Sequence, residues 1–301
     1  MTRLGGTLVL LYHRVSRVTS DPFGLAVRPD RFAQQCEILR RRFDVVPLRE
    51  MRGGKGEVSI TFDDGYADCL DARDILADSQ LPATFFITSG RLGKAADFWS
   101  DRLGKLLLDQ EPSVDHVELE IGGRPLWADI RSSKARERAH LALYWRLRPL
   151  PIGVISRTLD ELATQVGIPP TDPESHRWMD TDELRALDES ELVDVGSHTL
   201  THPLLKELPP DEQWREIDGS RRELEALLAT HVHTFSYPFG GPDTFDVVTS
   251  SLVRDAGYDL ACTAAGGLVE LDGDPFRIPR NTVGDWEADT FERWLDGWIG
   301  S

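Results

Sequence analysis

Short apolar runs rich in β-branched and aromatic residues alternate along this chain with stretches of helical periodicity, and this alternation constrains the fold most strongly. The apolar runs predict strands over residues 7–13, 58–64, 83–89, 192–198, 233–240 and 259–264. The periodic stretches predict helices over residues 30–42, 66–79, 180–190, 210–230, 246–257 and 289–299. Strands that alternate with helices favour a largely parallel α/β sheet. An open sheet and a barrel both fit this pattern.

The alternation is interrupted over about residues 97–178. This interval predicts a hairpin around Gly122 and Gly123, followed by two helical stretches that end near Gly167. A length of 301 residues suits two average domains or one large barrel. We interpret residues 1–301 as a single domain that carries this interval as an insertion, or cap.

The composition excludes several classes of protein. A net charge of −17 repels nucleic acids and anionic membrane surfaces, and it is compatible with a sugar or another neutral substrate. The three cysteines, Cys36, Cys69 and Cys262, form no CxxC pair, which favours a reducing compartment. The first apolar run is shorter than the core of a signal peptide, and no run reaches the length of a membrane span. We therefore expect a cytoplasmic protein.

Polar side chains end several of the predicted strands: His13, Asp63 and Asp64, His198, and Tyr237. In a parallel barrel the carboxyl ends of the strands meet at one face, where active sites lie. The strand ends therefore predict one site that is assembled from segments far apart in the sequence.

Asp63 and Asp64 stand in ITFDDGYAD, directly before Gly65. Neighbouring residues inside a strand point to opposite faces, so two adjacent aspartates can share a site only where the strand ends. Two carboxylates after an apolar run need a cation or solvent. A simpler interpretation is an acidic strand-to-helix turn in which one aspartate caps the helix.

His198 and His202 stand in GSHTLTHPLL. The first histidine ends an apolar run, and Pro203 favours an extended or turn conformation at His202, so the pair does not lie on a helix. No glutamate follows His198, which excludes a HExxH metalloprotease. Two histidines on a loop can still share a metal with a carboxylate from another strand, since two histidines, a carboxylate and water form a known catalytic zinc set.

Together, TFDDG (61–65) and SHTLTHP (197–203) resemble the first two motifs of the polysaccharide deacetylase family, also called the NodB-homology family. SYPFG (236–240) resembles its third motif, and YHRV (12–15), LPATFFITSG (81–90) and WMDTDELRAL (178–187) are also similar to it. The likeness covers nearly the whole chain, and residues 97–178 are its least typical part. It implies a distorted (β/α) barrel of about seven parallel strands with a mostly helical insertion.

The resemblance also implies roles for single residues. Asp64, His198 and His202 would hold a divalent metal, most often Zn²⁺, and Asp63 would be the general base that activates water against an acetamide carbonyl. The backbone N–H of Tyr237 would help to stabilise the oxyanion. The late histidine that serves as general acid in the family is absent here, and our candidate is His13. The family's arginine before the third motif is also absent, and Arg280 could replace it by pairing with Asp63.

The leading hypothesis is a metal-dependent hydrolase that removes an N-acetyl group from an amino sugar in a carbohydrate, polysaccharide or glycoside precursor. An amidase or deformylase acting on a small non-sugar amide, and a non-catalytic carbohydrate-binding relative, are the alternatives. A metal-free glycosidase is disfavoured, because adjacent aspartates do not reach the ~5 Å or greater separation across a glycosidic bond.

Overall fold

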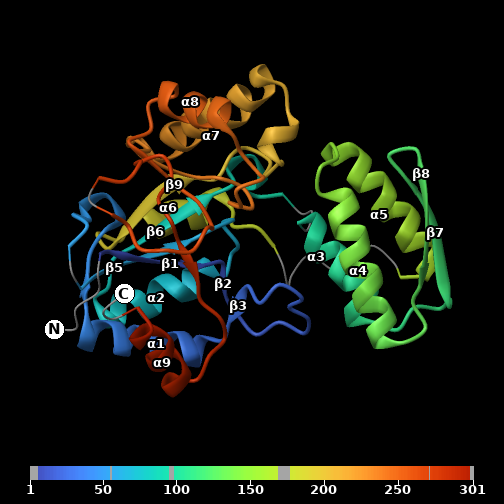
Figure 1. Cartoon of the computed structure of the whole chain (residues 1–301), viewed down its shortest axis with the longest axis horizontal. Coiled ribbons are helices and arrows are strands. Elements are labelled where there is room, and N and C mark those ends of the chain that lie inside the picture. Colours follow the sequence, from blue (N-terminus) through green and yellow to red (C-terminus); the bar gives the residue numbers. More distant parts are fainter. Residues whose placement is uncertain (1–5, 55, 95–97, 169–176, 271, 299–301) are drawn as a thin grey trace. The chain divides into compact units, whose positions relative to one another are not determined.

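A computed structural model describes residues 6–54, 56–94, 98–168, 177–270 and 272–298. The chain divides into two compact units (Figure 1). The first unit comprises Met1–Arg17, Gly24–Lys94 and Trp178–Ser301, and the second comprises Val18–Phe23 and Ala95–Arg177. The second unit thus covers nearly the residues that the sequence predicts as an insertion, and it also takes in a short segment from much earlier in the chain.

A parallel sheet forms the centre of the first unit, which confirms the predicted α/β architecture of about seven parallel strands. β12 and β11 are the two edges of this curled sheet, and β4 (Asp44–Val45) pairs with the start of β5. In spatial order the strands are β11 (Leu260–Cys262), β10 (Thr234–Ser236), β9 (Val193–Ser197), β6 (Ala83–Ile87), β5 (Glu57–Phe62), β1 (Leu8–Tyr12) and β12 (Asn281–Thr282).

The predicted helices of the first unit are all present, with ends that differ by a few residues. Pro29 begins the first of them, since proline lacks the N–H that a first turn leaves unbonded. Asp180 and Asp246 each cap a later helix through the backbone N–H groups of the first turn. The helices are α1 (Pro29–Arg42), α2 (Cys69–Ser79), α6 (Thr181–Asp188), α7 (Pro210–Leu228), α8 (Val247–Asp255) and α9 (Ala288–Asp296).

Apolar side chains cover both faces of the sheet, as expected for parallel strands packed between layers. All five residues of β1 are buried. Leu8 and Leu10 belong to the larger core cluster, which contains side chains of α1, α2 and α9, whereas Val9 belongs to a smaller cluster on the other face. The three cysteines are buried and unbridged. Among the described helices, none is both long and apolar enough to cross a membrane.

The second unit packs helices beside a two-stranded hairpin (Figure 1). The hairpin is the predicted one, because Gly122 and Gly123 form its turn with φ of 60° and 77°, which glycine adopts readily. Gly167 ends the last helix in the left-handed region, as predicted. The elements are α3 (Trp99–Gly104) with a π-helical turn at Lys105–Asp109, β7 (His116–Ile121), β8 (Arg124–Asp129), α4 (Ser133–Leu147) and α5 (Ile152–Val166).

Candidate metal centre

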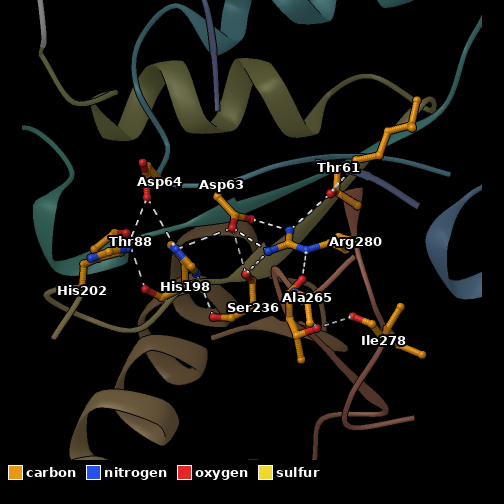
Figure 2. Close-up of polar contacts among 12 residues, drawn as sticks. Thr61, Asp63, Asp64, Thr88, His198, His202, Ser236, Ala265, Ile278 and Arg280 are labelled. Atoms are coloured by element: carbon orange, nitrogen blue, oxygen red, sulfur yellow. Dashed lines mark hydrogen bonds and ion pairs between the residues drawn. The ribbon is translucent and has the colours of Figure 1, made fainter. Parts of the chain in front are cut away.

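The predicted strand ends meet at one edge of the sheet in the first unit. His13 follows β1, the two aspartates 63 and 64 follow β5, and His198 follows β9. β1 and β5 run side by side, and β6 separates β5 from β9. Figure 2 shows the two aspartates, His198 and His202 gathered at this edge. The parallel topology therefore brings together residues that are up to about two hundred positions apart in the sequence.

Asp64, His198 and His202 form a buried group whose ligand atoms all lie within 4.8 Å of one another. Asp64 Oδ1 is 3.5 Å from His198 Nε2 and 3.5 Å from His202 Nε2 (Figure 2). Two imidazole nitrogens and one carboxylate oxygen are a common ligand set for catalytic zinc, which leaves a coordination position for water or substrate. Asp64, His198 and His202 therefore fit a divalent metal.

A backbone carbonyl fixes the orientation of His198. Its Nδ1 lies 2.8 Å from the carbonyl oxygen of Ser236, so Nδ1–H donates this bond and Nε2 presents its lone pair towards Asp64. Metal-binding histidines typically use their second nitrogen in this way, which sets the tautomer and raises the basicity of the ligand. This contact is a second feature of the structure that fits a metal centre.

The pKa values of the two histidines are shifted in opposite directions. Burial lowers the pKa of His202 to about 3, with a further contribution from the neighbouring His198, so His202 is neutral at pH 7. Burial also disfavours a charge on His198, but the carboxylates of Asp63 and Asp64 outweigh it and raise the pKa of His198 above its usual value. Burial raises the pKa of Asp64, whereas the adjacent histidines lower it by more, so that Asp64 is ionised.

Asp63 is held by Arg280 through two hydrogen bonds. Asp63 Oδ1 accepts from Nη1 at 2.7 Å, and Asp63 Oδ2 accepts from Nη2 at 2.6 Å. Ser236 Oγ lies between them, since it accepts from Arg280 Nη2 at 2.7 Å and donates to Asp63 Oδ2 at 3.1 Å (Figure 2). The structure thus contains the pairing of Arg280 with Asp63 that the sequence led us to expect.

The Arg280 guanidinium is completely buried and is fully engaged. Its Nε donates to the carbonyl of Thr263, and Nη1 also donates to Thr61 Oγ1 at 3.2 Å. Burial alone would raise the pKa of Asp63, but the charge of Arg280 reverses the effect and holds that pKa well below its usual range. Asp63 is therefore an oriented carboxylate that is ionised at pH 7 and lies beside the candidate metal ligands, with its Oδ2 at 3.8 Å from His198 Nε2.

His13 lies in the electrostatic field of the same group. Burial has the largest effect on its pKa and lowers it below the usual value, although Asp64 and Asp63 act in the opposite direction. Its Nδ1 has no hydrogen-bond partner among the described residues. The structure therefore places His13 near the two aspartates, mainly as a neutral imidazole at pH 7.

The backbone N–H and the side chain of Tyr237 both have partners within the fold of the first unit. Its backbone N–H donates to the carbonyl of Cys262 at 3.1 Å, as part of the contact between neighbouring chain segments of β10 and β11. Its hydroxyl donates to the carbonyl of Phe276, and its ring stacks on Phe245. The N–H of Tyr237 is bonded within the sheet, and its role towards the oxyanion stays a prediction.

Backbone strain is concentrated at this site. Six described residues other than glycine have positive φ, and two of these, Gln80 and Ala229, end helices. The other four are Asp64 (79°), Thr199 (68°), His202 (62°) and Phe239 (63°), and the ring of Phe239 packs against that of His202 at 4.7 Å. Sparsely populated backbone conformations are held at functional sites by the surrounding structure.

The sequence motifs did not single out Ser236 or Thr199. Ser236 could have been noticed as the residue before Tyr-Pro.

Three large aromatic residues, Tyr66 and Trp178 of the first unit and Trp99 of the second, are buried core residues. Tyr66 and Trp178 are each 2% exposed and stack on each other at 5.3 Å, and Arg14 lies over the Tyr66 ring. Trp99 is buried in the second unit, against Tyr144. These contacts favour packing over sugar stacking for all three.

The sequence profile described as polysaccharide deacetylase matches residues 50–120 and 171–261, which is more than half of the chain. The matched segments contain Asp63, Asp64, His198, His202 and Ser236, whereas His13 and Arg280 lie outside them. No curated protein matches the chain.

Several solved structures share the fold. A polysaccharide deacetylase from Bacillus cereus is 16% identical with a TM-score of 0.62, and the match covers 97% of this chain and 69% of that one. The deacetylase PplD from Streptococcus pyogenes, solved with acetate, is 15% identical (TM-score 0.61; coverage 99% and 100%). IcaB from Ammonifex degensii is 18% identical (TM-score 0.61; coverage 99% and 99%).

Proposed function

Because the chain belongs to the polysaccharide deacetylase family, we propose that it is a zinc-dependent hydrolase that removes the N-acetyl group from an amino sugar in a carbohydrate. The family and the fold support a carbohydrate deacetylase in general terms. The observation that carries the finer proposal is the group Asp64, His198 and His202, which lies beside a carboxylate held by a buried arginine.

Each residue of the site has a part in the hydrolysis of an amide. A zinc ion held by Asp64, His198 and His202 would supply a Lewis acid for the carbonyl and lower the pKa of a nearby water molecule. Asp63 takes a proton from the attacking water as the new C–O bond forms. Arg280 orients both carboxylate oxygens, and Ser236 donates a second bond to Oδ2. Oδ1 accepts from Arg280 Nη1, so its second lone pair remains for the proton.

The amide nitrogen must gain a proton before the C–N bond breaks. The products are then acetate and the free amine of the sugar. We propose that His13 donates this proton. His13 follows β1, which pairs with β5, the strand that precedes the two aspartates, and its Nδ1 has no hydrogen-bond partner among the described residues. Since burial lowers the pKa of His13, only the protonated fraction would act as acid at pH 7, which gives the role a measurable pH dependence.

The test combines metal content with turnover. Elemental analysis and acetate release from an N-acetylglucosamine oligomer are measured for the wild type, for His198→Ala/His202→Ala, and for His116→Ala/His231→Ala as a matched control at exposed histidines. We expect about one equivalent of zinc and acetate release in the wild type and the control, and neither in the first variant. A wild type that stays metal-free after reconstitution contradicts the proposal.

The alternatives give different results in the same assay. A non-catalytic relative would bind the oligomer without releasing acetate. An amidase for small non-sugar amides would release acetate from acetanilide and leave the oligomer intact.

A further inference from the structure

A cavity of about 390 Å³ is lined by residues of the second unit alone, so it has no residue in common with the candidate metal centre of the first unit. Arg136, Glu137 and His140 line it from α4, and Ser20 and Asp21 line it from the short segment Val18–Phe23. A volume in this range holds a small ligand of one or two rings. Nothing in the proposed deacetylation uses these residues.

His140 is the unusual group in this cavity. The residue is completely buried, and neither ring nitrogen has a hydrogen-bond partner among the described residues. Buried polar atoms are almost always paired, so an unpaired imidazole that lines a cavity indicates a bound group. Phe23 lies against the ring at a centroid distance of 5.6 Å, and this contact holds the imidazole in place without a polar bond.

The state of His140 limits what can bind there. Burial lowers its pKa to about 4, so the ring is neutral at pH 7 and offers one N–H donor and one lone pair. A hydroxyl group can satisfy either function, because it both donates and accepts. Arg136 adds a further donor, since its Nε is buried without a partner in the part of the chain that the structure describes.

The charges around the cavity disfavour an anion. Asp21 and Glu137 carry two negative charges, and Arg136 carries one positive charge, so with a neutral His140 the lining is net negative. A phosphate or carboxylate would be repelled. The hydroxyl of Ser20 donates to Asp109 and adds an acceptor to the cavity, and Leu108 and Leu141 supply apolar surface for C–H groups.

We propose that this cavity binds a neutral saccharide unit, through hydrogen bonds from its hydroxyl groups to His140 and Arg136. The inference rests on the proposed function for the nature of the ligand, and it assigns to the second unit a sugar site of its own.

The test uses the full chain with His198→Ala/His202→Ala, so that the probe is not hydrolysed. Long-range ¹H–¹⁵N correlation spectra report the two ring nitrogens of His140 during titration with the β-1,4 trimer of N-acetylglucosamine. We expect saturable shifts of the His140 nitrogens. Arg136→Leu should weaken binding at least tenfold, or ~1.4 kcal/mol, in calorimetry, and His140→Phe should weaken it by a similar factor. Arg138→Leu on the same helix should leave it unchanged.

The outcomes separate the two proposals. The saccharide site is refuted if the His140 nitrogen signals do not shift at saturating trimer. It is also refuted if the Arg136→Leu and Arg138→Leu variants bind the trimer with equal affinity, or if inorganic phosphate shifts these signals and the trimer does not. Acetate release by the wild type is measured in parallel. Release without a response at His140 refutes only the site, whereas a response without release supports the site and refutes the deacetylase.

Discussion

Replacing Arg280 by methionine should destabilise the first unit in a pH-dependent way. In the wild type, two N–O contacts of 2.7 and 2.6 Å join Arg280 and Asp63, and both side chains are almost completely buried. At an effective dielectric constant of about 20, a charge pair at this distance gains roughly 6 kcal/mol. The cost of removing both charges from water is of similar size, so the pair itself contributes little net stability.

The variant loses the attraction but keeps the cost of burying Asp63. Breaking a buried ion pair from one side typically costs ~3–5 kcal/mol, because the remaining charge has no partner. Asp63→Asn/Arg280→Met should therefore be more stable than the sum of the single losses predicts, by a coupling energy of about 0.5–3 kcal/mol.

The pH dependence follows from the pKa of Asp63. In the wild type this pKa is depressed, so the ion pair stabilises the fold fully above the unfolded value of ~3.9 and is lost as pH falls through the folded value. Without Arg280, burial acts with less opposition and the pKa should rise above ~3.9. The stability of the variant then decreases as pH rises.

Native-state hydrogen exchange of the β1 and β5 amides in chelator, at about pH 5 and about pH 8, measures the free energy of opening in the first unit. We expect the difference between wild type and Arg280→Met to be larger at the higher pH. A difference that is the same at both pH values, or single losses that simply add in the double variant, would refute the argument.

Three further predictions concern the site and its support. Asp63→Asn should retain zinc in elemental analysis and lose about 10²–10⁴-fold in kcat, and unchanged turnover would exclude Asp63 as the base. His13→Gln should keep the metal and remove the decrease of kcat at high pH. In the wild type the midpoint of this decrease should lie below the usual histidine pKa of ~6.5. An unchanged kcat–pH profile would mean that the acid is another group. Gly196→Ala should lower the free energy of unfolding by about 1–3 kcal/mol in urea titrations. The added Cβ would lie 2.5 Å from a Phe86 ring carbon and 2.5 Å from Thr234 Oγ1. An unfolding free energy equal to that of the wild type would contradict the close packing of β9.

The sequence was sufficient for β1, β5, β6, β9, β10 and β11 and for the convergence of their ends. Apolar composition and length define β5 and β9, and parallel pairing then requires Asp63, Asp64 and His198 to meet. The resemblance to polysaccharide deacetylases, based on these motifs, is confirmed by the family match.

The details that the sequence missed depend on local hydrogen bonding and long-range pairing. β12 contains two residues, too few for a periodic pattern, so periodicity alone does not place Arg280 beside Asp63. The sequence also did not indicate the bond from the Tyr237 N–H to the Cys262 carbonyl, because this bond lies one residue beyond the end of β10 at Ser236. Likewise, no periodicity indicates that Val18–Phe23 belongs with the second unit.

The placement of Arg280 beside β12 has a consequence for how the molecule assembles. β12 pairs with β1, with Leu10 opposite Asn281, so this contact joins two segments that are separated by almost the whole length of the chain. Until that closure, Asp63 would be a carboxylate among apolar strands without its counter-ion. A partly folded chain should therefore leave this edge of the sheet open to water, and the slow, entropically costly pairing of β1 with β12 should be the step that makes the base usable. Catalytic competence would then report completed folding of the first unit.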